Sequence, residues 1–381
     1  MALAVPGVQN SKIKSSRVRF EVMKRYLFIV LLMMLAGTGF VCANDGVYFA
    51  NGSQLVPVRE TDISVSREVL TISLCDDGFA RVEVDYEFLN HGAAKTVQMG
   101  FEAMKPYNTA DTLNPAGIHP YIKDFTVVMN GRQLAYRNAV VEPGELDTPY
   151  TGPKDDRPEE FEQYAYAYCF EATFREGVNH VHHTYRYQMS YGVGRTFEVP
   201  YWLKPAARWQ GGTIGDFTLR IRTPRTAKHF IIADSLFTDH EFVVTEGTGK
   251  VRHSKYGWSP RLVEVALRDG TVEWHSRDFR PVDNICIQSA DTYTSFNKKY
   301  PLGTFYDRSE SYMNWQPEQD FPEWLARNLP YANRGYVFKK KALRKHFSQF
   351  WWYMPDEEYR PSTDDFTPRE WRLIREHRLG L

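Results

Sequence analysis

The sequence predicts a mainly β protein, with an antiparallel β-sandwich body (one or two sandwiches) followed by a small α-helical module. Apolar and polar residues alternate through much of 47–290, the pattern of strands that bury one face. Turn signals recur between these segments and long helical periods are absent, which favours a sandwich. After residue 290 the alternation stops, and five of the nine tryptophans follow residue 310.

Residues 1–43 are predicted to be an N-terminal extension with a signal peptide and no part of the fold. Lys24 and Arg25 precede the apolar run YLFIVLLMMLAGTGFV. A cut after Ala43 leaves small residues at positions −3 and −1, as signal peptidase requires. We therefore expect an exported protein of the periplasm or cell surface.

Two other readings of the N-terminus stay open. Met23 is the more natural start, but a chain begun at Met1 can keep the apolar run as a single transmembrane anchor, although the run is short for that purpose. A lipid on Cys42 ranks third, because Val41 fits the lipidation motif poorly. Contact with the membrane is expected only through such an uncleaved N-terminal helix.

Charge and cysteine content exclude several classes of protein. The whole chain has 47 cations and 47 anions, and residues 1–43 hold six of the cations and one anion, which leaves 41 against 46. This mildly acidic balance argues against nucleic acid as a partner. Cys75, Cys169 and Cys286 are too few for a disulfide scaffold and show no zinc-binding spacing. They allow at most one intramolecular disulfide, whose pairing the sequence leaves open, and free thiols are the favoured interpretation.

The β body begins with two well-marked hairpins. In 79–90, FARVEVDYEFLN alternates strictly, and Asp77-Gly78 separates it from an alternating segment at 70–74. The segment 125–136 carries Asn130-Gly131 at its turn. Further strands are predicted at 164–174, 178–191, 216–223, 228–232, 240–245, 261–267, 271–276 and 284–289, with Asp269-Gly270 between two of them.

An acidic loop interrupts the body at 141–163. It holds four prolines and a run of acids without periodicity, which predicts a long exposed excursion.

Three histidines in HVHH are the most conspicuous candidate ligands. On a strand, His180 and His182 share the polar face while His183 points to the apolar face. No carboxylate recurs two positions away on that strand, and a catalytic zinc ion needs three protein ligands. The sequence therefore favours His180 and His182 as solvent-facing residues, with weak adventitious metal binding by this pair as the alternative, and no metal site is assigned.

No catalytic residue is assigned. GxSxG, SxxK, HExxH, P-loop and GxGxxG motifs are absent beyond residue 43, and no cofactor is expected. Paired acids such as Asp76-Asp77 fall in turns, where solvated acids are common.

The helical module contains a predicted helix stop. If a helix ends at Arg334, Gly335 takes the left-handed position, and Tyr331 and Tyr336 are the pair that touch in a Schellman stop. Pro330 shortens or breaks the helix that precedes the stop.

Two more helices are expected after it. KKKALRKHFSQF places an apolar face opposite a basic one, the apolar members being Ala342, Leu343, His346, Phe347 and Phe350. The last helix starts with Thr367 as N-cap, Pro368 at N1 and Glu370 at N3, a capping box.

This module resembles the YARHG domain of exported bacterial proteins. The matching residues are Leu325, Arg327, Asn328, Tyr331, Ala332, Gly335, Tyr336, Phe338, Leu343, Phe347, Trp352 and Tyr353. Asn333 and Arg334 stand where the family has Arg and His, so any role of that polar pair is in doubt here. The resemblance implies an extracellular, wall- or surface-associated module without an established reaction.

The body from 44 to 290 weakly resembles a secreted bacterial domain of unknown function. FLNHGAAKTVQMGFE, HHTYRYQMSYG and YWLKPAARWQGGTIGDFTLRI carry this likeness. It implies export and a β fold.

Candidate binding residues lie on the basic face of the module and are Lys339, Lys340, Lys341, Arg344, Lys345 and Trp351. The cations can contact anionic envelope polymers, lipid headgroups or the acidic loop, with plain solvation as the alternative. Trp351 can add a stacking platform for sugars. The motif residues Tyr331, Ala332, Gly335, Tyr336, Phe338, Phe347 and Trp352 are interpreted as structural.

The sequence thus favours a binding or structural protein of the cell envelope whose partner is a wall or surface polymer or another envelope protein. The rival is an envelope-polymer hydrolase with its site in the β body, which a cleft with converging titratable groups would favour. Four segments are expected: 1–43 extension and signal peptide, 44–290 β body, 291–320 linker, and 321–381 helical module.

Overall fold

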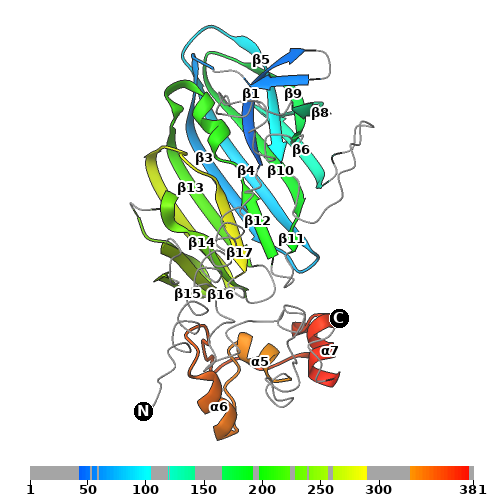
Figure 1. The fold of residues 1–381 in the computed structure, drawn as a ribbon, viewed down its shortest axis with the longest axis vertical. Coiled ribbons are helices and arrows are strands. Elements are labelled where there is room, and N and C mark those ends of the chain that lie inside the picture. The colour runs from blue at the N-terminus through cyan, green and yellow to red at the C-terminus, as the bar shows by residue number, and fades with distance from the viewer. Residues whose placement is uncertain are drawn as a thin grey trace, which may run out of the picture. The chain divides into compact units, whose positions relative to one another are not determined.

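The computed structural model describes residues 43–51, 54–57, 60–103, 119, 121–141, 165–191, 197–223, 228–237, 240–255, 261–289 and 327–376. Within these ranges the fold is mainly β, as the sequence predicts, with short helices near the C-terminus (Figure 1). The predicted signal peptide up to residue 42, the acidic loop beyond residue 141 and the linker lie outside the described residues, whereas Ala43, the predicted last residue of the signal peptide, begins β1. No helix in the described ranges is long and apolar enough to cross a membrane.

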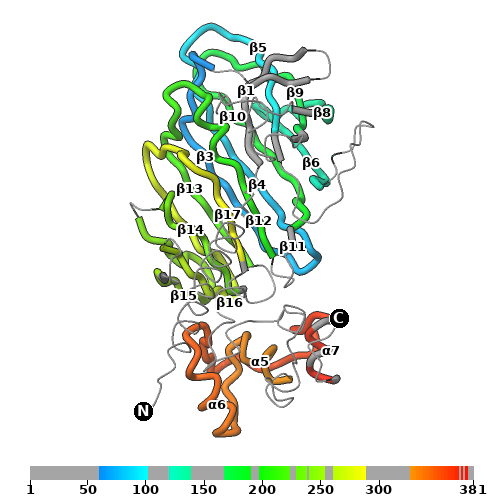
Figure 2. The backbone as a smooth tube through the Cα atoms, viewed as in Figure 1, coloured from blue at the N-terminus to red at the C-terminus, as the bar shows by residue number. Residues whose placement is uncertain are grey.

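Twelve described strands form one large sheet. Its order is β11 (Ser190–Tyr191), β12 (Phe197–Tyr201), β17 (Ile285–Ser289), β14 (Lys228–Ala233), β16 (Arg261–Phe279), β13 (Ile214–Thr223), β3 (Ile63–Leu74), β4 (Phe79–Asn90), β10 (Gly177–Gln188), β6 (Ile122–Met129) and β7 (Arg132–Gln133), with β15 (Val243–Lys255) paired to β16. Figure 2 shows β3 between β4 and β13, a segment far along the chain. β13 and β3 run parallel, so the sheet is mixed and the antiparallel prediction holds only in part.

The alternation read from the sequence explains the inner face of this sheet. Val82 and Val84 of β4 are buried and pair in register with Ile72 and Leu70 of β3. Glu83 between them and the flanking Arg81 and Asp85 are charged, exposed and point away from the core. A one-residue slip would exchange the two faces, so burial fixes the register.

A smaller sheet closes on itself in the order β1 (Ala43–Asn51), β2 (Gln54–Pro57), β8 (Arg137–Val141), β9 (Ala165–Phe174) and β5 (Lys95–Ala103), with β5 paired to β1. Aromatic rings join it to the large sheet. Phe101 lies 5.3 Å from Phe125, and Phe174 lies 5.4 Å from Phe88, between ring centroids. The two sheets therefore share one aromatic core.

The predicted Asn130-Gly131 hairpin is confirmed, because both residues have positive φ, 50° and 79°.

Asp269-Gly270 was expected to separate two strands, but β16 continues through it. Gly270 lies opposite Gly247 of β15, and a Cβ on either glycine would collide with the backbone of the other strand. The dipeptide thus marks close strand approach instead of a turn, and β15 extends well beyond the predicted 240–245.

In residues 327–376, the described part of the C-terminal module, there are three α-helices: α5 (Leu329–Asn333), α6 (Lys341–Phe347) and α7 (Pro368–Glu376). Their buried cluster consists of Leu329, Ala332, Phe338, Leu343, Phe347, Phe350, Trp352 and Tyr353, together with Ala266 of β16. Ala342, placed on the apolar face by the sequence, is exposed. Short 3-10 turns occur at Lys204–Arg208, Gln210–Gly212, Asp234–Leu236 and Thr363–Asp365.

Candidate functional site

The helix stop predicted from YANRGY is present at the end of α5. Gly335 has φ +81°, its amide donates to the carbonyl of Ala332 at 2.9 Å, and the amide of Tyr336 donates to the carbonyl of Tyr331 at 3.0 Å. The rings of the two tyrosines lie 5.9 Å apart. These bonds and this contact define a Schellman stop. The four motif residues therefore hold the chain reversal between α5 and α6.

Three other motif residues form the core of the module. Phe338, Phe347 and Trp352 are each at most 3% exposed. Phe338 and Phe347 stack at 5.0 Å, and Trp352 stacks on Phe350 at 5.3 Å. The matched Leu325 lies outside the described residues. These three motif side chains therefore pack in the core of the module.

The predicted binding cations form one exposed group around α6. We call this group, which consists of Lys339, Lys340, Lys341, Arg344 and Lys345, the cationic surface. None of the five makes an ion pair with another residue that the structure describes, and the first turn of α6 contains no acid. Leu343 and Phe347 bury the opposite side of the helix. The cationic surface therefore presents positive charge to solvent, with no ion-pair partner in the described ranges.

Trp351, the sixth predicted binding residue, lies against the β15–β16 ribbon. Its indole nitrogen donates to Glu264 Oε1 at 3.2 Å, and the guanidinium of Arg252 lies 4.1 Å from its ring. Lys250 Nζ donates to the carbonyl oxygens of Trp351 at 2.8 Å and of Tyr353 at 3.2 Å. Only the part of the indole left uncovered is available to a sugar, and that role stays a prediction.

Glu264 is the centre of this contact. It is fully buried and also accepts hydrogen bonds from His229 at 2.8 Å and from Arg252 at 2.6 Å. Burial disfavours the ionised carboxylate, but these hydrogen bonds and the charges of both partners outweigh burial and lower the pKa of Glu264 from 4.5 to about 2. The acid therefore stays ionised inside the protein. Sequence reasoning missed it because its partners are distant in the chain.

Arg334, where the motif departs from its family, has a structural role. Its guanidinium makes two bonds to Glu370 of α7, Nη1–Oε1 at 2.5 Å and Nη2–Oε2 at 2.8 Å, and lies 4.7 Å from the ring of Phe366. Glu370 also accepts from the Thr367 amide at 2.8 Å, which confirms the predicted capping box. Arg334 thus joins the end of α5 to the start of α7.

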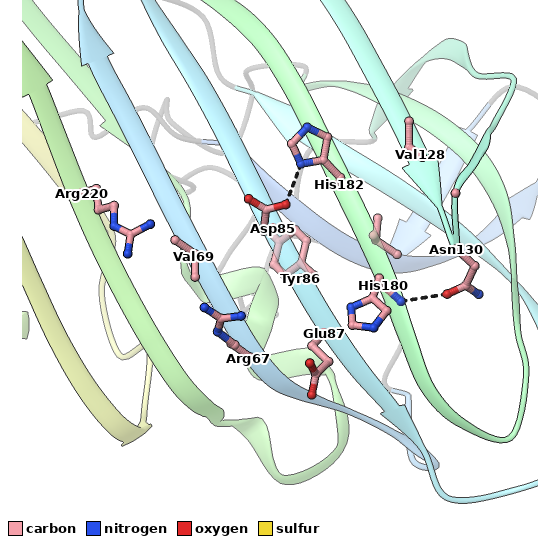
Figure 3. A pocket seen from close by; sticks show the side chains of 12 residues that line it. Arg67, Val69, Asp85, Tyr86, Glu87, Val128, Asn130, His180, His182 and Arg220 are labelled. Atoms are coloured by element: carbon pink, nitrogen blue, oxygen red, sulfur yellow. Dashed lines mark hydrogen bonds and ion pairs between the residues drawn. The ribbon is translucent and has the colours of Figure 1, made fainter. Parts of the chain in front are cut away.

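A groove of about 280 Å³ lies on the outer face of the large sheet (Figure 3). It is lined by Arg67, Val69, Asp85, Tyr86, Glu87, Val128, Asn130, Gly131, His180, Val181, His182 and Arg220. His182 Nδ1 lies 2.7 Å from Asp85 Oδ1, and the backbone amide of His180 donates to the side-chain oxygen of Asn130 at 2.9 Å. Titratable groups from β3, β4, β10 and β13 converge here.

The two faces predicted for the histidine run are confirmed. His180 and His182 reach the outer face, whereas His183 is buried among aromatic rings, 5.4 Å from Phe101 and 5.4 Å from Phe125. The carboxylate that the strand itself lacks is supplied by Asp85 on the neighbouring strand. Cys75, Cys169 and Cys286 are free thiols, as the sequence predicts.

Comparison with solved structures shows two kinds of likeness. A Legionella pneumophila protein provisionally described as nutrient-binding is 20% identical and has a TM-score of 0.49, with 89% of this chain and 100% of that chain covered. An M1 zinc metallopeptidase from Deinococcus radiodurans is 7% identical and has a TM-score of 0.26. In that comparison 61% of this chain and 43% of the metallopeptidase are covered.

Comparison with sequences gives the family relationship. No curated protein sequence matches the chain. Residues 143–232 match a domain of unknown function, DUF4424, and residues 316–379 match the YARHG domain. The chain therefore carries a DUF4424 region in its β-rich middle and a YARHG domain at its C-terminus.

Proposed function

We propose that this chain is an exported cell-envelope protein whose YARHG domain binds an anionic wall or surface polymer through the cationic surface. The observation that carries the proposal is the group of five exposed cations on and just before α6, without ion-pair partners among the described residues. Ammonium groups attract phosphate and carboxylate groups as point charges. They therefore suit a polymer with repeated anionic groups better than one small ligand of defined shape.

The net charge of the chain beyond residue 43 supports a binding site that is confined to the cationic surface. Beyond residue 43 the anions outnumber the cations, 46 to 41, so the chain as a whole does not attract polyanions. The packing of α6 supports the same role, because buried Leu343 and Phe347 fix the helix that carries Lys341, Arg344 and Lys345. Binding should therefore depend on this helix and weaken as salt screens it.

Co-sedimentation with isolated cell-wall polymer tests the proposal. The chain from residue 44 should pellet at low salt and be released at high salt. Substituting Lys339, Lys340 and Lys345 by glutamine should weaken binding about tenfold, given roughly 0.5 kcal/mol for each exposed ionic contact. The matched control replaces the exposed Arg81, Arg132 and Arg137 of the β body by glutamine, with the same change of charge. Equal loss in both variants would refute a site on α6.

A second candidate, a hydrolase of the envelope polymer, is favoured by the groove. Asp85, Glu87, His180 and His182 converge there, as general acid–base chemistry would need. Soluble fragments released from the same polymer measure this activity, and Asp85→Asn should abolish their release.

Export itself is tested by N-terminal sequencing of the mature protein, which should begin at Asn44 if the leader is cleaved and upstream of it if the anchor is retained.

A further inference from the structure

The outer face of the large sheet pairs several of its acids with arginines. Arg220 Nε lies 2.7 Å from Glu273 Oε2, and Arg186 Nη2 lies 3.0 Å from Asp77 Oδ2. Two acids of β4, Glu83 and Asp85, have no lysine or arginine partner among the residues that the structure describes. They stand two positions apart, so both side chains point outward from the same strand. Within the described part of the chain, the side chain that meets these two acids is an imidazole.

That imidazole belongs to His182 of the neighbouring strand. The register of β4 and β10 sets His182 directly opposite Asp85, with Thr184 opposite Glu83. One ligand atom from each of Glu83, Asp85 and His182 lies within 4.8 Å of the other two. His182 Nδ1 and Asp85 Oδ1 are already 2.7 Å apart. Three potential metal ligands therefore converge from two adjacent strands.

We propose that Glu83, Asp85 and His182 bind a divalent transition metal ion of the zinc class. One nitrogen and two carboxylate oxygens suit such an ion, and the two negative charges match its charge. The ion takes the place of the hydrogen between His182 Nδ1 and Asp85 Oδ1, and the neutral imidazole then carries its proton on Nε2. Small side-chain rotations suffice, because all three side chains are at least partly exposed.

The surroundings of these residues leave one side of the ion open. Val69 of β3 lies opposite Asp85 and Val128 of β6 lies opposite His182, so apolar walls flank the ligands. Asp85 and His182 also line the groove, in which His180 and Arg67 stand nearby (Figure 3). Three protein ligands leave a fourth position for water or an anionic group. The groove is where that fourth ligand would lie.

The proposed metal site is independent of polymer binding by the YARHG domain. His182 of β10 supplies the imidazole, whereas both acids come from the neighbouring strand β4. The pairing of β4 with β10 joins residues about a hundred positions apart, which a strand-by-strand reading of the sequence does not reveal.

Metal titration tests the site. The chain, stripped with a chelator, is titrated with zinc by calorimetry and with cobalt by visible absorption, which reports ligand geometry. We expect a saturable site that Glu83→Gln, Asp85→Asn and His182→Asn each weaken at least tenfold. Circular dichroism checks that these variants fold.

Two matched histidine variants decide the outcome. His275 Nε2 lies 3.2 Å from Asp216 Oδ1 on the same face, a histidine–aspartate pair with no third metal-ligating side chain among the described residues. His180 lies in the same groove as the proposed ligands. His275→Asn and His180→Asn should leave the affinity unchanged. Absence of saturable binding, equal losses in these controls, or wild-type affinity in the three ligand variants would each overturn the proposal.

Discussion

Trp351 donates the hydrogen of its indole nitrogen to Oε1 of Glu264 at 3.2 Å, and this bond joins the YARHG domain to strand β16. The same carboxylate binds His229 and Arg252. A buried carboxylate without partners is costly, whereas one with three donors stays ionised at little cost. The domain and the β15–β16 ribbon therefore stabilise each other, because each supplies donors to one buried acid.

Acid should weaken the contact between Glu264 and its three donors. The pKa of Glu264, about 2, is depressed from 4.5, so its contribution to stability is complete above pH 4.5 and is lost as the pH falls toward 2. The depression corresponds to roughly 3 kcal/mol. Urea unfolding at a series of pH values between 6 and about 2.5 measures the loss.

Glu264→Gln is the control for that dependence. The amide cannot accept from three donors at once, so we expect a loss of about 3 kcal/mol at neutral pH. The variant should also lose stability less steeply between pH 4.5 and 2. A wild-type acid profile in this variant would mean that another carboxylate controls the transition.

Trp351 should contribute through both its N–H and its ring. Trp351→Phe keeps a ring near Arg252 but removes the donor, and should cost about 1 kcal/mol. Trp351→Ala should cost more and should raise the hydrogen exchange of β15 amides. Trp371, whose indole donates to the Thr363 carbonyl at 3.1 Å, is the matched control. Trp371→Phe should leave β15 exchange unchanged, and the same rise in both variants would exclude a specific contact of Trp351.

Local signals in the sequence predicted much of the fold. Alternation placed β4 at its observed bounds, Asn130-Gly131 gave its hairpin, and the residues around Gly335 gave the helix stop. These features depend on residues within a few positions of each other. The parallel pairing of β13 with β3 and the continuity of β16 through Gly270 depend on strands distant in the chain, and were missed.

The candidate sites also combine features that local sequence predicts with features that depend on residues distant in the chain. The exposed cations of α6 follow from helical periodicity, since Leu343 and Phe347 had to be buried. The partners of Glu264, Arg334 and His182 follow from tertiary contacts that no periodicity encodes. Arg334 is the clearest example of a contact that the sequence does not predict. Its departure from the family motif is visible in the sequence, but nothing there indicates its partner Glu370 in α7.

Gly335 should tolerate no side chain. Its φ of +81° disfavours other residues by roughly 1–2 kcal/mol, and a Cβ there would collide with the carbonyl oxygen of Met354 and with Arg268. We expect Gly335→Ala to cost more than about 2 kcal/mol. Gly131 has a similar φ of +79° but nothing within 4 Å of an added Cβ, so Gly131→Ala should cost only about 1 kcal/mol. Chemical denaturation compares the two, and equal costs would argue against the collision.

Arg334 and Glu370 form a paired ionic contact inside the YARHG domain. Glu370 is 2% exposed, and its two oxygens receive both the guanidinium and the Thr367 amide. Glu370→Gln keeps the shape but removes the charge, and should destabilise the YARHG domain by about 3 kcal/mol, because a largely buried guanidinium then lacks its counter-ion.

Arg334→Lys separates charge from geometry. Lysine keeps the positive charge but cannot make the paired bonds or lie flat against Phe366. We expect most of the loss seen in Glu370→Gln, whereas a stability equal to wild type would show that charge alone suffices. In a double-mutant cycle with Glu370→Gln, a coupling of at least about 1 kcal/mol would establish that the pair acts directly. Additive losses would mean that each residue acts through other contacts, Arg334 through the Pro330 and Asp365 carbonyls and Glu370 through the α7 cap.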